Sequence, residues 1–287
     1  MTSDTKSEFG ENSENNRGSD PNPVPMKHIL SYARRALDDY GMIRPGERVA
    51  VGVSAGKDSL SLLCALARLR QFYPVPFELS AITVDMGFGG VPGDFTGIQN
   101  LCAKLKVPYR IVPSNIAEIV FDIRHESNPC SLCAKLRRGA LHNAARESGC
   151  TAVALGHHFD DAVETFMLNL FYEGRVGCFS PVTDLSRTGI RVIRPLIYVP
   201  EKEIRAFASS AALPVVPSSC PANAHTEREN MKQLLRTLER NNRGLRHRIF
   251  GAMQRGNVDG FFLPGRRDIR FPEPDEESED GNGVETP

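Results

Sequence analysis

The chain has 287 residues, of which 40% are hydrophobic, and its 35 basic and 35 acidic residues give a formal net charge of zero. This length fits one large domain, or one domain with an appendage, and the apolar content is enough for a sizeable core. The charge is unevenly spread, because the two tails, 1–25 and 271–287, hold twelve acidic and two basic residues. The body, residues 26–270, carries 33 basic and 23 acidic residues, a net charge of +10, which favours an anionic partner such as nucleic acid.

The sequence pattern argues against a membrane or secreted protein and against a disulfide-rich protein. No apolar run approaches the length of a membrane span, and the amino-terminal segment lacks the apolar core of a signal peptide, so we expect no membrane contact. The seven cysteines are an odd number scattered over a long chain, which is not the pattern of a disulfide framework. A reducing, cytoplasmic location is therefore expected.

Strands and helices are predicted to alternate through most of the chain. Residues 1–25 are polar and Pro-punctuated, and we expect them to be disordered. Hydrophobic periodicity then predicts helices at 28–40, 59–71, 94–106, 132–148 and 160–172, and strands at 49–53, 79–85, 109–112 and 152–156. Strands separated by helices of this length predict an α/β fold, a doubly wound parallel sheet covered on both faces.

The alternation weakens after residue 172. Residues 191–196 are predicted to form an edge strand, because a proline ends the run. A short helix is expected at 200–212, with proline at its start, and two basic helices at 225–241 and 244–254. The acidic, Pro-containing segment from 271 onward is expected to be disordered.

The turn between the first predicted strand and its helix has the composition of an anion site. Residues 54–59 read Ser-Ala-Gly-Lys-Asp-Ser, and such small residues let backbone N–H groups converge on an anion at the positive end of the helix. Lys57 adds a charge for phosphate. The Walker pattern does not match, because three residues rather than four separate the two glycines and an acid follows the lysine. The alternative is an ordinary strand–turn–helix.

Cys130 and Cys133 form a C-x-x-C pair at the start of the 132–148 helix, where a helix N-terminus favours thiolate. The pair fits a redox dithiol, half of a zinc site, or half of an iron–sulfur site. Cys220 lies in a Pro-flanked loop before the basic helix and is the third candidate ligand. Cys64, Cys102 and Cys150 are expected to be small core residues.

Several motifs together resemble a known family. The turn 54–59 is similar to the PP-loop, S-G-G-K-D-S, of ATP pyrophosphatases that adenylate their substrates, with Ala55 in place of the first glycine. The segment 156–165, Gly-His-His-Phe-Asp-Asp-Ala-Val-Glu-Thr, looks like the second signature of PP-loop enzymes that act on tRNA. With the three cysteines and the Val-Ile-Arg-Pro-Leu run at 192–196, the chain resembles the tRNA 2-thiocytidine synthetase family over roughly 27–258.

The resemblance implies an activity and its site residues. In that family three cysteines hold a 4Fe-4S cluster, and the enzyme adenylates an anticodon-loop cytidine, at position 32, before replacing its 2-oxygen with sulfur. The implied cluster ligands are Cys130, Cys133 and Cys220. The expected ATP-binding residues are Ser54, Ala55, Gly56, Lys57, Asp58, Ser59, Asp85, Gly156 and His157. The expected catalytic residues are Lys57, Asp58 and Asp160, with Asp58 or Asp160 holding Mg²⁺.

The resemblance also suggests a domain organisation. Residues 26–215 are expected to be a PP-loop ATP pyrophosphatase domain with a leading helix, and 216–258 a basic helical region that carries Cys220. Residues 1–25 and 259–287 are the expected tails. Cys220 stands alone in Pro-Ser-Ser-Cys, where the family often has Pro-Cys-x-x-Cys.

The expected partners are tRNA and a cysteine desulfurase or other sulfide donor, and a homodimer is left open. Four alternatives remain at this point: 2-thiouridine formation, lysidine synthesis, a nucleotide-binding module without chemistry, and a protein that only binds tRNA. Zinc held by the three cysteines with His125 or His225 is the alternative to the cluster. Asp160 and Asp161 also fit an acidic pair at a helix N-terminus.

Overall fold

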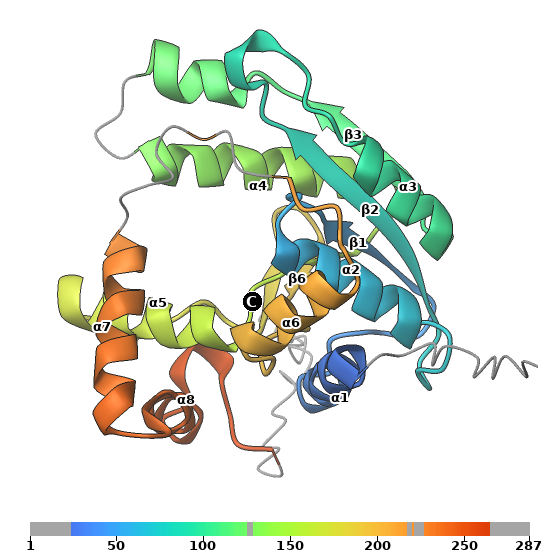
Figure 1. Cartoon of the computed structure of the whole chain (residues 1–287). Helices are drawn as coiled ribbons and strands as arrows, with labels where there is room; N and C mark the ends of the chain where they lie inside the picture. The colour runs from blue at the N-terminus through green and yellow to red at the C-terminus, as the bar shows by residue number, and fades with distance from the viewer. Residues whose placement is uncertain (1–23, 125–128, 217–219, 221–226, 265–287) are drawn as a thin grey trace, which may run out of the picture.

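A six-stranded sheet lies at the centre of the molecule (Figure 1). The computed structural model describes residues 24–124, 129–216, 220 and 227–264. The strands are β1 (Glu47–Gly52), β2 (Phe77–Asp85), β3 (Tyr109–Pro113), β4 (Ala152–Ala154), β5 (Val182–Leu185) and β6 (Ile190–Ile193). The helices are α1 (Val24–Asp39), α2 (Lys57–Leu69), α3 (Thr96–Leu105), α4 (Pro129–Glu147), α5 (Phe159–Tyr172), α6 (Glu201–Ser210), α7 (Glu227–Asn241) and α8 (Leu245–Arg255).

The strand order is β3-β2-β1-β4-β6-β5, and every neighbouring pair is parallel except β5 and β6. The predicted α/β sheet is therefore confirmed. The prediction that residues 191–196 form an edge strand is wrong, because β6 pairs with β4 on one side and with β5 on the other. The short strand β5 forms that edge instead, and the sequence analysis did not predict it.

The two faces of the sheet are covered by different helices. On one face α1, α2 and α6 pack together, and ten of the thirteen residues of α2 are buried, which makes α2 the central helix of that layer. On the other face α4 presents Leu141, Ala144 and Ala145 to Ala50 and Val153 of the sheet. Burial on both faces explains why the parallel strands read as continuous apolar runs.

The strand order reverses direction at β1, since β2 lies on one side of β1 and β4 on the other. In such sheets the loops leaving the carboxyl ends of the strands diverge at this point and leave room for a ligand. The β1–α2 turn and the β4–α5 connection both start here, so the switch point positions the candidate site.

The carboxyl-terminal helices α7 and α8 pack on α5, away from the sheet (Figure 1). The folded chain continues to Pro264, beyond the expected boundary at 258, and the fully buried Phe261 packs edge-on against Phe250 of α8. Both tails are expected to be disordered. Of their residues, the structure describes only 24–25, which belong to α1, and 259–264. Among the helices of the described ranges, none is long and apolar enough to cross a membrane.

Candidate nucleotide and cysteine site

The phosphate cradle, residues 54–59, is a hydrogen-bonded turn between β1 and α2. The Ser59 hydroxyl accepts from the backbone N–H of Ser54 at 3.1 Å, lies 3.3 Å from the Ser54 hydroxyl, and donates to the Gly56 carbonyl at 3.0 Å. Gly56 is the N-cap residue of α2. The first N–H groups of a helix have no partner within the helix, so this turn directs backbone donors and the positive helix end to one place. That arrangement suits the phosphates of a nucleotide.

Ala55 adopts the left-handed backbone conformation, with φ of +62°, in which glycine is the usual residue. Ala55 thus adopts a conformation that a glycine would reach without strain, at a local conformational cost of about 1–2 kcal/mol. The carbonyl of Ala55 accepts a hydrogen bond from the N–H of Val216 at 3.1 Å. The segment that leads to Cys220 is thereby joined directly to the cradle.

Lys57, at the start of α2, lies between two carboxylates. Its Nζ is 2.9 Å from Oδ1 of Asp58 and 3.2 Å from Oε1 of Glu201. Burial works against the charged form of Lys57, but Asp58 and then Glu201 raise its pKa, so it is protonated at neutral pH. A protonated lysine at the positive end of a helix is an anion-binding group.

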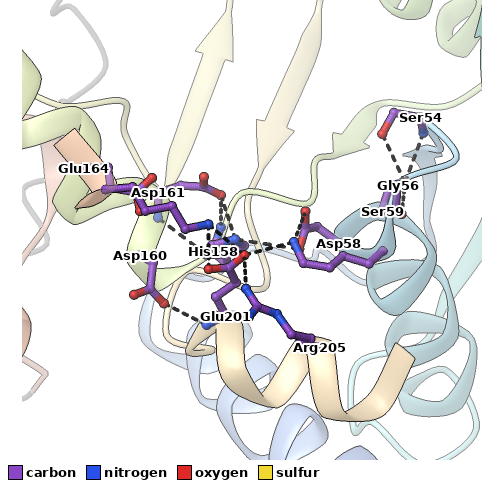
Figure 2. A network of polar contacts seen from close by, with 12 residues as sticks. Ser54, Gly56, Asp58, Ser59, His158, Asp160, Asp161, Glu164, Glu201 and Arg205 are labelled. Atoms are coloured by element: carbon purple, nitrogen blue, oxygen red, sulfur yellow. Dashed lines mark hydrogen bonds and ion pairs between the residues drawn. The ribbon is translucent and has the colours of Figure 1, made fainter. Parts of the chain in front are cut away.

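The β4–α5 connection contacts the cradle through Gly156 and His158. A Cβ on Gly156 would lie 3.0 Å from the backbone nitrogen of Ser59, so glycine permits the close approach of the two loops. His158 is the N-cap of α5 and exchanges hydrogen bonds with Asp161 in a capping box, at 3.0 and 3.4 Å. Its Nε2 lies 3.7 Å from Oδ1 of Asp58. Two signatures more than ninety residues apart thus form one network of polar contacts (Figure 2).

His157 packs against the ring of Phe179, with ring centroids 4.9 Å apart. Burial, followed by the charge of Arg194, lowers the pKa of His157 and keeps the ring neutral. Its Nδ1 is buried without a hydrogen-bond partner in the described part of the chain. The described ring contact of His157 is therefore with Phe179, and the expected contact with a nucleotide stays a prediction.

Both carboxylate oxygens of Asp160 already have partners within the protein, one through a hydrogen bond and one through an ion pair. Oδ2 accepts from the backbone N–H of Glu201 at 2.7 Å, and Oδ1 forms an ion pair with Nη1 of Arg246 at 2.8 Å. Asp161 forms a second ion pair, with Arg228 of α7, at 3.2 Å. The acidic pair at the N-terminus of α5 therefore fastens α7 and α8 to the edge of the site.

Asp85, the last residue of β2, shapes the loop that follows it. Its two oxygens accept from the N–H groups of Gly87 and Gly93, at 3.1 and 2.9 Å. This loop borders a cavity of about 740 Å³ at the carboxyl ends of β2 and β3, lined in part by Phe88, Pro113 and Phe121. A partly apolar cavity of this size suits a small-molecule ligand, and none of the residues that line it belongs to the cradle, residues 54–59.

Cys130 and Cys133 lie near the start of α4, about two to three helical turns before Leu141, whose side chain lies against Gly52 at the carboxyl end of β1. Cys130 is exposed, Cys133 and Cys220 are half-buried, and all are thiols rather than disulfides. Burial raises the pKa of the Cys133 thiol, Arg137 lowers it, and negative charge on Cys220 or Cys130 would raise it again. Cys220 therefore lies within electrostatic reach of the pair. Cys64, Cys102 and Cys150 are buried, as predicted.

The donor set fits a metal cluster in its chemistry, since two thiols on α4 and one in the segment joined to the cradle are the ligand type that iron–sulfur clusters use. Among the described residues, no three His, Cys, Asp or Glu side chains are already grouped at metal-binding distance. Residues 217–219 and 221–226, which flank Cys220, lie outside the described part, as do His125 and His225 of the zinc alternative. The assignment of Cys130, Cys133 and Cys220 as ligands stays a prediction.

Several charged residues of the site were not singled out from the sequence. They are Glu164, Glu201, Arg205, Lys232 and Arg246. The regular spacing of basic residues along 225–241 can be read from the sequence, but a helix face exposed to solvent would show the same spacing. Which of its cations turns toward the cradle depends on how α7 packs on α5.

Glu164 is a carboxylate with only 3% of its surface exposed. Burial, followed by the charge of Asp161, raises its pKa to about 7, against the opposing charges of Lys232, Arg228 and Arg246. Its Oε1 lies 3.6 Å from Nη1 of Arg246, beyond hydrogen-bond distance. Glu164 is therefore a buried acid that costs stability when it ionises.

We expect Glu164→Gln to raise the free energy of unfolding by about 2 kcal/mol near pH 8 and to leave it almost unchanged near pH 4. The folded-state pKa of about 7 exceeds the ordinary value of 4.5, so the destabilising ionisation begins above 4.5 and is complete above 7. Urea denaturation across this pH range measures the difference. Glu173→Gln, exposed at the end of the same helix, is the control and should show no such trend. A gain independent of pH would contradict the argument.

The fold and the cradle define an ATP-binding α/β protein of the PP-loop class. The family model described as "PP-loop domain" matches residues 27–238, most of the folded chain. The resemblance drawn from residues 54–59 and 156–165 is thereby confirmed.

Relatives narrow the class further. The chain is 40% identical over 243 residues to the tRNA-cytidine(32) 2-sulfurtransferase of Geobacter sulfurreducens, covering 84% of this chain and 93% of that protein. It is 41% identical over 222 residues to the protein of the same name from Pelobacter propionicus, covering 75% and 81%. The U34-tRNA thiolase NcsA from Methanococcus maripaludis, solved with its 4Fe-4S cluster, matches with a TM-score of 0.65 at 25% identity, over 83% of this chain and 85% of that one. The chain belongs to the tRNA-cytidine(32) 2-sulfurtransferase family.

Proposed function

We propose that this protein is an ATP-dependent tRNA sulfurtransferase that adenylates the C2 oxygen of cytidine 32 and replaces it with sulfur, giving 2-thiocytidine. The observation that carries the proposal is the direct link between the two halves of the site. The cradle follows β1, the cysteine pair lies on α4 beyond Leu141 at the carboxyl end of the same strand, and Val216, in the segment before Cys220, donates a hydrogen bond to Ala55 of the cradle at 3.1 Å. The names of the two bacterial relatives support the substrate.

The first half of the reaction activates the base. The C2 oxygen of cytidine is a poor leaving group, so it attacks the α-phosphate of ATP and expels pyrophosphate. Lys57 and the N–H groups at the start of α2 stabilise the charge that develops on the departing pyrophosphate. Lys57 is held for this role by Asp58 and Glu201.

A Mg²⁺ ion suits the same phosphates, where it would neutralise part of their charge. Of the two predicted ligands, Asp58 is the better candidate, because its side chain is a third exposed and it belongs to the cradle itself. Both oxygens of Asp160 already accept bonds from Glu201 and Arg246.

The second half of the reaction places sulfur on C2 and releases AMP. Cys130, Cys133 and Cys220 would hold a 4Fe-4S cluster, which supplies an iron that no cysteine occupies and that can carry sulfur. The 4Fe-4S cluster of the archaeal thiolase supports a cluster of this type in the present chain. A cysteine desulfurase or free sulfide would supply the sulfur.

The test is a thiolation assay with the cluster reconstituted anaerobically. Purified protein, ATP, sulfide and a tRNA with cytidine at position 32 should give 2-thiocytidine in nucleoside mass spectrometry. The same tRNA with uridine at that position should give no thiolated nucleoside. Sulfur found at uridine 34 instead would support the second candidate, uridine thiolation, which the likeness to the archaeal U34 thiolase favours. No thiolated nucleoside from any tRNA would overturn the proposal.

A further inference from the structure

One carboxylate next to the cradle holds three cations from three helices. Oε1 of Glu201, on the first turn of α6, lies 3.2 Å from Nζ of Lys57 on α2 and 3.0 Å from Nη2 of Arg205 on α6. Lys232 of α7 contacts both oxygens of the same carboxylate, at 2.9 Å from Oε1 and 2.8 Å from Oε2. The backbone N–H of Glu201 is fixed in turn by Asp160, at 2.7 Å.

Lys232 differs from the other cations of α7 in its burial. Its side chain is 19% exposed, whereas that of Arg236, one turn later on the helix, is 50% exposed. Glu201 itself is 13% exposed. Holding a lysine in such a place costs side-chain entropy and desolvation, which a surface cation does not bear.

The carboxylate remains ionised in this setting. Burial favours the neutral acid, but the hydrogen bond from Lys232 and the charge of Lys57 lower the pKa of Glu201 to about 2. With Asp58 included, two carboxylates face three cations, so the group keeps a surplus of positive charge beside the phosphate cradle. Net positive charge beside the cradle favours the binding of an additional anion there.

We propose that Lys232 is a second phosphate-binding lysine of the ATP site, delivered from the carboxyl-terminal region by α7. Because Lys57 and Lys232 contact the same oxygen of Glu201, their ammonium groups are close enough for one phosphate group to bridge them. Glu201 holds both lysines beside the cradle and is the anion that the pyrophosphate end of ATP replaces. The inference rests on the proposed ATP site and adds a ligand that lies outside both signature segments.

A phosphate-binding role for Lys232 predicts which ligands lose affinity when this lysine is removed. Lys57, at the N-terminus of α2, and Lys232 would face the β- and γ-phosphates, the part of ATP that leaves as pyrophosphate. AMP lacks both groups. Loss of Lys232 should therefore weaken binding of ATP and of inorganic pyrophosphate while leaving AMP binding unchanged.

The experiment is isothermal titration of the full-length protein, without cluster and without tRNA, with ATP, inorganic pyrophosphate and AMP in turn. For Lys232→Met we expect about 10- to 30-fold weaker binding of ATP and pyrophosphate, and AMP binding within about twofold of wild type. Lys232→Arg keeps the charge and should retain ATP affinity within about threefold. Lys202→Met, an exposed lysine next to Glu201, is the matched control and should bind all three ligands as wild type does.

Two results would overturn the inference. One is Lys232→Met protein that binds ATP as tightly as wild type, with only a lower melting temperature, which would make Lys232 a structural partner of Glu201. The other is an equal loss for Lys232→Met and Lys232→Arg, or for AMP and ATP. Wild-type protein that binds no ATP would end both this inference and the proposed function. ATP bound through Lys232 without any thiolated tRNA would end the proposed function alone.

Discussion

Replacing Cys220 with serine should reduce formation of 2-thiocytidine at least 100-fold while leaving ATP binding intact. The expected reason is that two cysteines on one turn of α4 cannot hold a cubane cluster without the third thiolate. The cradle is built from β1 and α2, so its hydrogen bonds do not involve the Cys220 side chain. Two separate assays, pyrophosphate release in the presence of tRNA and mass spectrometry of the nucleosides, distinguish the half-reactions.

Cys150→Ala is the matched control for this experiment. Cys150 is buried just before β4, at the amino-terminal edge of the sheet, opposite the site. Its replacement should lower stability by about 1 kcal/mol and preserve thiolation. Iron and zinc are measured on every variant, because stoichiometric zinc in the wild-type protein would favour the alternative with His125 or His225. Thiolation by Cys220→Ser at the wild-type rate would contradict the assignment.

Replacing Lys57 with methionine should slow pyrophosphate release about 10²- to 10³-fold, the typical cost of losing one positioned donor that stabilises developing charge. The fold should survive the change. Asp58 is a third exposed to solvent, and Glu201 keeps Lys232 and Arg205, so no buried carboxylate is left without a cation. A quenched-flow or coupled pyrophosphate assay at saturating tRNA gives the rate.

Lys202→Met again serves as the comparison, since it removes an equal charge from the exposed side of α6. The circular dichroism spectrum and melting temperature of Lys57→Met show whether the protein is folded when it is assayed. Unchanged pyrophosphate release from folded Lys57→Met would mean that Lys57 serves only as a counter-ion of Asp58 and Glu201. In that case the cradle would bind phosphate through its backbone and Ser54 and Ser59 alone.

The long elements of the fold were predictable because each carries a local pattern. The strand expected at 79–85 is β2 over Phe77–Asp85, and the helix expected at 160–172 is α5 over Phe159–Tyr172. Both are apolar enough to show their periodicity, as elements of a covered parallel sheet are. The strand β5 was missed because its four residues are only partly buried, and its existence depends on pairing with β6.

The cradle and the second signature could be predicted from the sequence for a different reason. A phosphate turn needs small residues and a lysine at fixed spacing, so residues 54–59 carry their chemistry within one short segment. The left-handed conformation of Ala55 could not be read in the same way. Alanine does not favour it, and it follows from the surrounding hydrogen bonds, including that from Val216.

The sequence by itself determined the class of fold, the location of the cradle and the cysteine pair, since each depends on residues that are neighbours along the chain. The tertiary structure alone decided which charges meet: Lys57, Glu201 and Lys232 come from three helices, and Asp160 turns to Arg246 of α8. The two partners of an ion pair have no fixed separation along the chain, so the sequence does not show which charges will meet. Their partners are selected by the way α6, α7 and α8 pack against the edge of the sheet, which is a property of the folded whole.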